Sequence, residues 1–164
     1  MILSILDVMK TRPRVDSRVI ELQGRGRLMG ELLAAGLEVA IPARDRGVDL
    51  VVYLDLKGNT PEFVAYPIQM KAASKRHFSI SKKYARIRDL ILAFVWHVND
   101  AVLPVTYAMT YPDAVRIGRR MKYTDTASWK QDGKYSTQSP SKKLTALLEP
   151  HRMDKKRWGT MVRR

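Results

Sequence analysis

The chain has 164 residues, of which 45% are hydrophobic and 28% charged, and these values predict one globular domain and exclude a disordered chain. Its 30 Lys and Arg residues against 16 Asp and Glu give a net charge of +14, which favours a polyanionic partner, above all nucleic acid. The absence of cysteine excludes disulfides, cysteine zinc sites and thiol nucleophiles, and with no signal-peptide pattern or long apolar run it favours a cytoplasmic protein without a membrane partner.

The first elements along the chain are predicted to be helices. Residues 1–10 have the apolar spacing of a short helix, which Pro13 breaks. A second helix should begin at Asp16 or Ser17, either of which can cap it, and should end near residue 35, because Gly36 is a natural stop. Its apolar face should consist of Val19, Ile20, Leu22, Leu28, Met29, Leu32 and Leu33. Its three glycines suggest close packing against another element or close approach to a backbone, since each costs up to about 1 kcal/mol relative to alanine.

Strands dominate the middle of the chain, and helices return near its end. β-rich and alternating segments predict strands at 37–42, 48–54, 62–71, 78–80, 90–98 and 104–109. The first three should form an antiparallel meander, and a turn centred on Gly58 and Asn59 would place position 49 opposite position 68. A short basic helix is predicted at 113–121, and a second helix with Ser139 as N-cap and Pro140 at its first position should reach Leu148. Residues 128–136 show only a polar pattern, and 153–164 form a basic segment that is either ordered or frayed.

Most sequence signatures of catalysis are missing. The three histidines, His77, His97 and His151, are scattered, which argues against a histidine zinc site. No nucleophile elbow occurs, and the glycines of the second helix lack the lysine of a phosphate-binding loop.

One group of residues does have the chemistry of a reaction centre. Asp49 begins one strand of a predicted hairpin, and Gln69 and Lys71 end the other strand. Alternation places Gln69 and Lys71 on the same face, within reach of Asp49. Carboxylate and amide oxygens are ligands for Mg²⁺, and a lysine can orient water and offset charge that develops on a phosphate. The alternative is a surface Asp and Lys beside a hairpin, because the pattern is short and common.

The segments Arg46-Gly47-Val48-Asp49-Leu50 and Pro67-Ile68-Gln69-Met70-Lys71 follow a helix and a first strand. In this order they resemble the PD-(D/E)XK nuclease superfamily, and within it the Mrr-type restriction endonucleases, in which Gln often replaces the acid of the motif. Holliday-junction resolvases are similar but usually keep Glu. The resemblance covers residues 17–73 and implies an α/β, restriction endonuclease-like fold, in which helices flank a central mixed sheet with an antiparallel meander.

The same resemblance implies an activity, namely Mg²⁺-dependent hydrolysis of phosphodiester bonds in DNA, with Mn²⁺ as a substitute ion and RNA as an open alternative substrate. Asp49 and Gln69 would bind the metal, with the Met70 carbonyl as a third ligand, and Lys71 would position the water. Because Gln69 stands where the motif usually has an acid, a catalytically inactive nucleic-acid-binding module with the same fold is the second hypothesis.

Nucleases of this kind usually add a glutamate from the first helix, and Glu21 and Glu31 are the two choices. Glu21 lies 15 residues before Gly36, or about 22 Å at 1.5 Å per residue, which places it level with Asp49. Glu31 lies only about 7.5 Å from that end. We therefore expect Glu21 to be the catalytic and metal-binding acid, and Glu31 to be a solvated helix residue.

Other basic residues are expected to bind the phosphates of the nucleic acid. They are Arg25, Arg27, Lys82, Lys83, Lys142 and Lys143. Trp129 and Tyr135 are expected either to stack on bases or to pack in the core. Residues 1–164 should form one domain, with a helix and linker at 1–16, the helix and meander at 17–73, and the remaining strands and basic helices at 74–164. Many relatives act as dimers, and the sequence leaves a homodimer and a monomer open.

Overall fold

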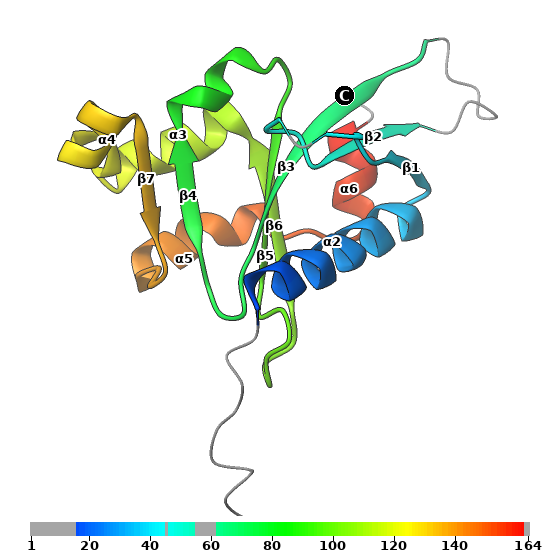
Figure 1. The fold of residues 1–164 in the computed structure, drawn as a ribbon, viewed down its shortest axis with the longest axis horizontal. Helices are drawn as coiled ribbons and strands as arrows, with labels where there is room; N and C mark the ends of the chain where they lie inside the picture. Colours follow the sequence, from blue (N-terminus) through cyan, green and yellow to red (C-terminus); the bar gives the residue numbers. More distant parts are fainter. Residues whose placement is uncertain (1–15, 45, 55–61, 163–164) are drawn as a thin grey trace, which may run out of the picture.

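The computed structural model describes residues 16–44, 46–54 and 62–162, so the expected helix at 1–10 and the turn at Gly58 and Asn59 lie outside the described residues. The strands are β1 Leu37–Ala40, β2 Leu50–Leu54, β3 Ala65–Ala72, β4 Phe78–Ser81, β5 Ile91–Trp96, β6 Val105–Thr110 and β7 Lys134–Thr137. The helices are α2 Ser17–Ala34, α3 Tyr111–Arg120, α4 Ala127–Asp132, α5 Lys142–Leu148 and α6 Lys155–Val162, with short 3-10 helices η1 Lys82–Arg86, η2 Tyr123–Asp125 and η3 Glu149–His151 (Figure 1).

The main sheet has five strands in the order β1-β2-β3-β5-β6, and β4 and β7 form a separate pair. As the sequence predicts, β1, β2 and β3 form an antiparallel meander. β3 then pairs in parallel with β5, and β5 pairs antiparallel with β6. A parallel pair needs a crossover connection, which residues 73–90 provide. The α/β class is thus confirmed, as are the central mixed sheet and the helices that flank it.

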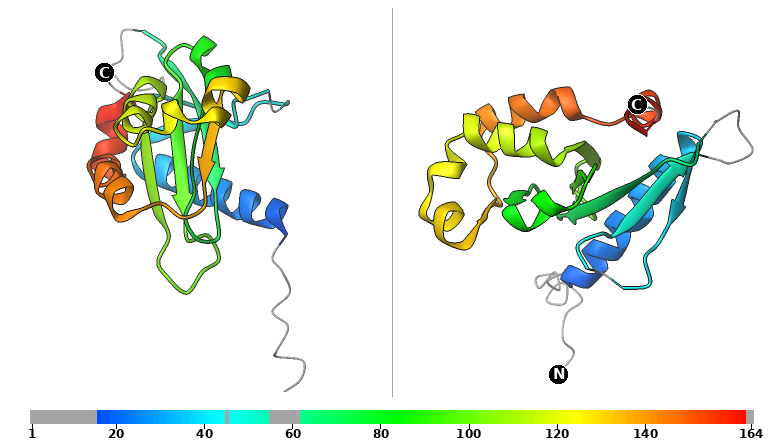
Figure 2. Two further views of the ribbon diagram at one scale, coloured as in Figure 1. Left: turned by 90° about the vertical axis from the view of Figure 1, so that its left-hand side faces the viewer. Right: turned by 90° about the horizontal axis from the view of Figure 1, so that it is seen from above.

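The strand β5 separates two hydrophobic clusters and is buried along its whole length. Ile91, Ala93 and Val95 face the cluster that contains α2 and α6, while Leu92 and Phe94 face the cluster that contains β4, α3, α4 and α5. Figure 2 shows α2 set apart from α3, α4 and α5 across the sheet. Burial on both faces explains why this strand reads as a continuous apolar run. Among the described helices, none is long and apolar enough to cross a membrane.

The helix α2 begins and ends as predicted but buries a narrower face. The Asp16 carboxylate accepts a hydrogen bond from the Arg18 backbone N–H at 2.9 Å, and Gly36 ends the helix with a φ of +76°. The buried positions are Ile20, Gly24, Leu28 and Leu32. The predicted face was wrong for Val19, Leu22 and Leu33, which are 42%, 67% and 51% exposed. The sheet covers a single row at four-residue spacing, so apolar residues beside that row face outward.

The three glycines of α2 differ in their surroundings. A Cβ on Gly24 would overlap the Cβ of Ala72 on β3, whereas a Cβ on Gly26 or Gly30 would meet nothing within 4 Å. Only Gly24 therefore fulfils the expectation of close backbone packing.

This difference predicts opposite effects of the same substitution. Gly24→Ala should lower the free energy of unfolding by about 1–2 kcal/mol, because overpacking exceeds the gain in helix propensity. Gly26→Ala, the matched control, should raise it by up to about 1 kcal/mol. Urea denaturation of both variants measures the difference, and equal effects would contradict the close approach of α2 to β3.

The C-terminal half contains elements that the sequence pattern misplaces. The helix α5 starts at Lys142 and not after Ser139, because the Ser141 hydroxyl caps the Leu144 N–H at 3.2 Å. The polar segment at 128–136 contains parts of α4 and β7, and β7 pairs with β4. The final basic segment forms α6 through Val162, and its Trp158 and Val162 are buried in the hydrophobic cluster that contains α2.

Candidate active site

The register of β2 and β3 brings Asp49 beside Gln69. Leu50 lies opposite Ile68, one position away from the predicted register. Both side chains are fully buried in the hydrophobic cluster that contains α2 and α6. This apolar pairing fixes the register, because a shift of one residue would move every side chain of the strand to the opposite face of the sheet. Asp49 directly precedes Leu50, and its backbone N–H donates to the Ile68 carbonyl at 2.8 Å. Asp49 therefore stands level with Gln69.

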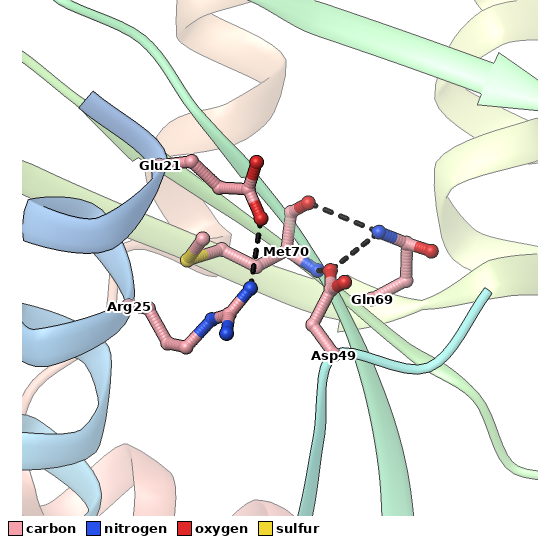
Figure 3. Close-up of polar contacts among 5 residues, drawn as sticks. All are labelled: Glu21, Arg25, Asp49, Gln69 and Met70. Atoms are coloured by element: carbon pink, nitrogen blue, oxygen red, sulfur yellow. Dashed lines mark hydrogen bonds and ion pairs between the residues drawn. The ribbon is translucent and has the colours of Figure 1, made fainter. Parts of the chain in front are cut away.

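Asp49, Gln69 and Met70 form a buried polar cluster. Asp49 is 7% exposed and Gln69 5%. Asp49 Oδ2 accepts from the Met70 backbone N–H at 2.6 Å and from Gln69 Nε2 at 2.5 Å. Gln69 Nε2 also donates to the Met70 carbonyl oxygen at 3.1 Å (Figure 3). The Asp49 carboxylate and the Met70 carbonyl oxygen thus both accept from one amide nitrogen, so that three polar groups meet in a buried place.

The backbone explains why a side-chain oxygen acceptor is placed here. On one side, Met70 lies opposite Ala93 of β5. On the other side, β2 begins only at Leu50, which lies opposite Ile68, so the Asp49 side chain takes over the N–H of Met70. Asp49 therefore has a structural role in closing the end of the β2–β3 pair, in addition to any role in chemistry.

Lys71 lies on the same side of β3 as Gln69, because the two residues are two positions apart, or about 7 Å. Its side chain is half-buried. It borders a cavity of about 660 Å³ between the start of α2 and the loop after β3. Burial and then the Lys71 ammonium lower the pKa of His77 below its usual value, so Lys71 also lies near His77.

A wall of the site is formed by residues around η1. Gly47 has a φ of +95°, and a Cβ at this position would meet Tyr84 Cε1 at 3.7 Å and Gln69 Oε1 at 4.0 Å. The ammonium of Lys83 lies 4.9 Å from the centre of the Tyr84 ring. Lys82 instead lies over Trp129, at 5.5 Å from the ring centre.

The two helix glutamates have different partners. Glu21 is exposed and pairs with Arg25 Nη2 at 2.7 Å, and Figure 3 shows this pair extending from α2 beside Met70. Glu31 binds Arg27 Nε at 3.0 Å and the Thr106 hydroxyl at 2.9 Å. The expectation that Glu31 is a solvated residue was therefore wrong, since it ties α2 to β6.

The remaining residues predicted to bind nucleic acid divide into engaged and exposed ones. Arg27 donates to the Pro104 carbonyl oxygen at 3.2 Å in addition to its pairing with Glu31, so it has a structural function. Arg25 Nε is buried without a hydrogen-bond partner in the described part of the chain. Lys142 and Lys143 are exposed in the first turn of α5. The aromatic candidates pack, since Trp129 is buried and Tyr135 stacks on Tyr123 at 3.9 Å.

The sequence analysis missed one group of residues near Lys71. Lys75, Arg76, His77 and Gln138 line the same cavity. The available signal was the run Lys75-Arg76-His77, which follows two residues after the end of the strand that carries Lys71. Over residues 16–44, 46–54 and 62–162, no three His, Cys, Asp or Glu side chains lie close enough to hold a metal ion, so the candidate set depends on an amide and a carbonyl.

Comparison with known proteins finds no matching family model, no matching curated protein and no matching solved structure.

Proposed function

We propose that this protein hydrolyses phosphodiester bonds in DNA with Mg²⁺, at the site of Asp49, Gln69, Met70 and Lys71, and that its fold is restriction endonuclease-like. The observation that carries the proposal is the buried meeting of the Asp49 carboxylate, the Met70 carbonyl and the Gln69 amide at 2.5–3.1 Å. The order of a helix, a strand, a second strand directly preceded by Asp49, and a strand with Gln69 and Lys71 supports the superfamily resemblance. The net charge of +14 supports a nucleic-acid substrate.

The donor set fits a hard divalent cation after one small rearrangement. Gln69 Nε2 sits where Asp49 Oδ2 and the Met70 carbonyl oxygen converge. A half-turn of the amide would present Gln69 Oε1 there, and Asp49, Gln69 and Met70 would then hold Mg²⁺ or Mn²⁺ through oxygen. A bound ion would supply Lewis acidity toward the phosphate and an activated water.

The protein's own residues have separate tasks in this hydrolysis. The oxygen of water bonds to phosphorus and gives up one proton to the solvent, the bond from phosphorus to the leaving sugar oxygen breaks, and that oxygen takes up a proton from the solvent. The Lys71 ammonium orients the water and offsets the charge that develops on the phosphate oxygens. Glu21 would assist the metal or the water once it separates from Arg25. The Arg25 guanidinium is then available to bind a phosphate.

Incubation with supercoiled plasmid, single-stranded DNA and RNA tests the proposal. Cleavage is expected with Mg²⁺ or Mn²⁺ and should stop in EDTA. An Asp49→Ala protein purified in parallel controls for contaminating nucleases. If none of the three substrates is cleaved with Mg²⁺ or with Mn²⁺, the catalytic proposal is wrong.

One observation favours the inactive binding module as the second candidate. The Gln69 amide already satisfies both Asp49 Oδ2 and the Met70 carbonyl oxygen, so the cluster is complete as a hydrogen-bonded unit without an ion. Such a module should bind DNA in EDTA without any divalent ion, and should cleave none.

Both candidates predict salt-dependent DNA binding in EDTA. If about five phosphates are neutralised, the slope of log K against log salt should be near −4.5 for duplex. Lys142→Ala/Lys143→Ala should reduce the magnitude of the slope by up to about 2. Lys155→Ala/Lys156→Ala removes the same charge from the first turn of α6, which packs in the cluster that contains α2 and not in that of α5. This control should change the salt slope less. A flat salt response would contradict a polyanionic partner.

A further inference from the structure

A cavity lies beside Lys71, and its other lining residues are not part of the candidate active site. It measures about 660 Å³ and is lined by the start of α2, residues 71–77 and Gln138. This volume is in the range of small-ligand sites and is sufficient for one nucleotide. Because Lys71 belongs to both the cavity and the candidate active site, a ligand in the cavity would lie next to the reacting phosphate.

The loop that forms one wall of this cavity is held in place by its backbone. The Ala73 N–H donates to the Val95 carbonyl at 2.9 Å, and the Val98 N–H donates to the Ala73 carbonyl at 3.0 Å. The Lys75 carbonyl accepts from the His97 N–H at 2.8 Å, and Trp96 Nε1 donates to the His77 carbonyl at 2.7 Å. Four bonds to the end of β5 thus fix the loop before any ligand binds, which reduces the entropy cost of binding.

The side chains of the cavity favour an anion. Lys71, Lys75 and Arg76 bring three positive charges. Among the described lining residues, Asp16 is the one with a carboxylate, and it already accepts from the Arg18 N–H at 2.9 Å as the cap of α2. Lys75 also lies near the Asp100 carboxylate outside the lining, whose pKa is lowered mainly by a hydrogen bond to His97 and in part by Lys75. The lowered pKa of His77 keeps its imidazole neutral at pH 7, so that it has one N–H to donate. These groups suit phosphate oxygens, which accept hydrogen bonds from several donors.

We propose that this cavity is a phosphate subsite that holds a nucleotide of the substrate strand next to the one being cleaved, with Lys75 and Arg76 as its main anion contacts. The inference rests on the proposed function for the identity of the strand. Its phosphate comes either from a strand end or from an internal phosphodiester, and the two sources share the same chemistry.

Binding of fluorescent eight-nucleotide single strands in EDTA tests this subsite by anisotropy. Strands with a 5′-phosphate, a 3′-phosphate or neither are compared. Lys75→Ala/Arg76→Ala should weaken binding about tenfold. Lys130→Ala/Lys134→Ala is the control. Lys130 is exposed on α4 and Lys134 is exposed at the first position of β7, whereas Gln138 follows the last position of β7. The control should change binding less than about threefold.

The pattern across the strands identifies the source of the phosphate. If a terminal phosphate tightens binding to the natural protein but not to Lys75→Ala/Arg76→Ala, the subsite takes a strand end. If all three strands bind alike and the variant still loses tenfold, it takes an internal phosphodiester. An equal loss in the variant and its control overturns the subsite.

Failure of the subsite and failure of the nuclease proposal give different results. A tenfold contrast in binding with no cleavage in Mg²⁺ or Mn²⁺ keeps the subsite and removes the nuclease. Cleavage with an unchanged KM in Lys75→Ala/Arg76→Ala, together with no contrast in binding, keeps the nuclease and removes the subsite. Circular dichroism should show unchanged folding, because the loop is held through its backbone and not through these side chains.

Discussion

Lys71→Ala is expected to lower the rate of DNA cleavage by about two orders of magnitude or more. One preorganised charge at a reacting phosphate has an effect of this size. The free energy of unfolding should change little, because a partly exposed ammonium adds little stability. The affinity for DNA in EDTA should fall by no more than about threefold, because Lys75 and Arg76 remain as the main anion contacts. Single-turnover cleavage kinetics with saturating enzyme separate the loss in rate from any loss in binding.

The control for this variant is Lys130→Ala, which removes the same charge from an exposed position of α4. It should cleave DNA within about threefold of the natural protein. If Lys71→Ala cleaves as fast as this control, Lys71 is only the end of a strand and the assignment of the site is wrong.

Asp49→Asn should remove cleavage in the same way and also weaken metal binding, but the structure adds a cost in stability. Asp49 Oδ2 accepts two buried hydrogen bonds, from Met70 N–H and Gln69 Nε2. A replaced acceptor in such a cluster costs about 1–3 kcal/mol. Lys71→Ala is therefore the cleaner test of catalysis.

Gln69→Glu is expected to make the stability of the protein depend on Mg²⁺. Gln69 Nε2 donates to Asp49 Oδ2 at 2.5 Å, and the substitution replaces this donor with a second carboxylate. Without metal the two carboxylates repel each other in a buried place, which should cost about 2 kcal/mol or more. With Mg²⁺ the added charge should tighten metal binding by Coulomb attraction. The Tm should therefore fall in EDTA and recover with Mg²⁺.

The matched control is Gln138→Glu, which adds the same charge at an exposed position of the neighbouring cavity. It should show no Mg²⁺-dependent recovery of the Tm. If Gln69→Glu binds Mg²⁺ no better than the natural protein by calorimetry, the cluster around Asp49 is not a metal site.

The same variant separates the two functional candidates. If the natural protein cleaves DNA, Gln69→Glu should reach full activity at a lower Mg²⁺ concentration. If the natural protein is inert and the variant gains Mg²⁺-dependent cleavage, the natural protein is the binding module, and the restriction endonuclease-like fold is retained.

Local sequence rules were sufficient wherever a residue acts through its immediate neighbours. Gly36 ends α2 because a positive φ favours glycine. The alternating and apolar runs placed β1, β2, β3, β5 and β6, and they predicted the antiparallel meander. The position of Asp49 before a strand and of Gln69 near the end of the next strand was also readable, so their proximity followed from hairpin pairing alone.

Contacts between distant segments decided the rest. The sequence pattern could not pair β7 with β4, since Lys134 lies 53 residues after its partner Ser81 and both strands are short. It could not identify Glu31 as a link between α2 and β6, because its partner Thr106 is 75 residues away.

The sequence by itself determined the α/β class, the meander and the residues Asp49, Gln69 and Lys71 as a candidate site, because periodicity and strand alternation are local properties. Only the tertiary structure decided that the Gln69 amide is bonded to Asp49 and Met70. It also decided that Lys71 opens onto a basic cavity between α2 and the β3–β4 loop. Register, side-chain rotamers and cavities depend on how buried surfaces fit together across the fold, and a one-dimensional pattern does not contain that fit.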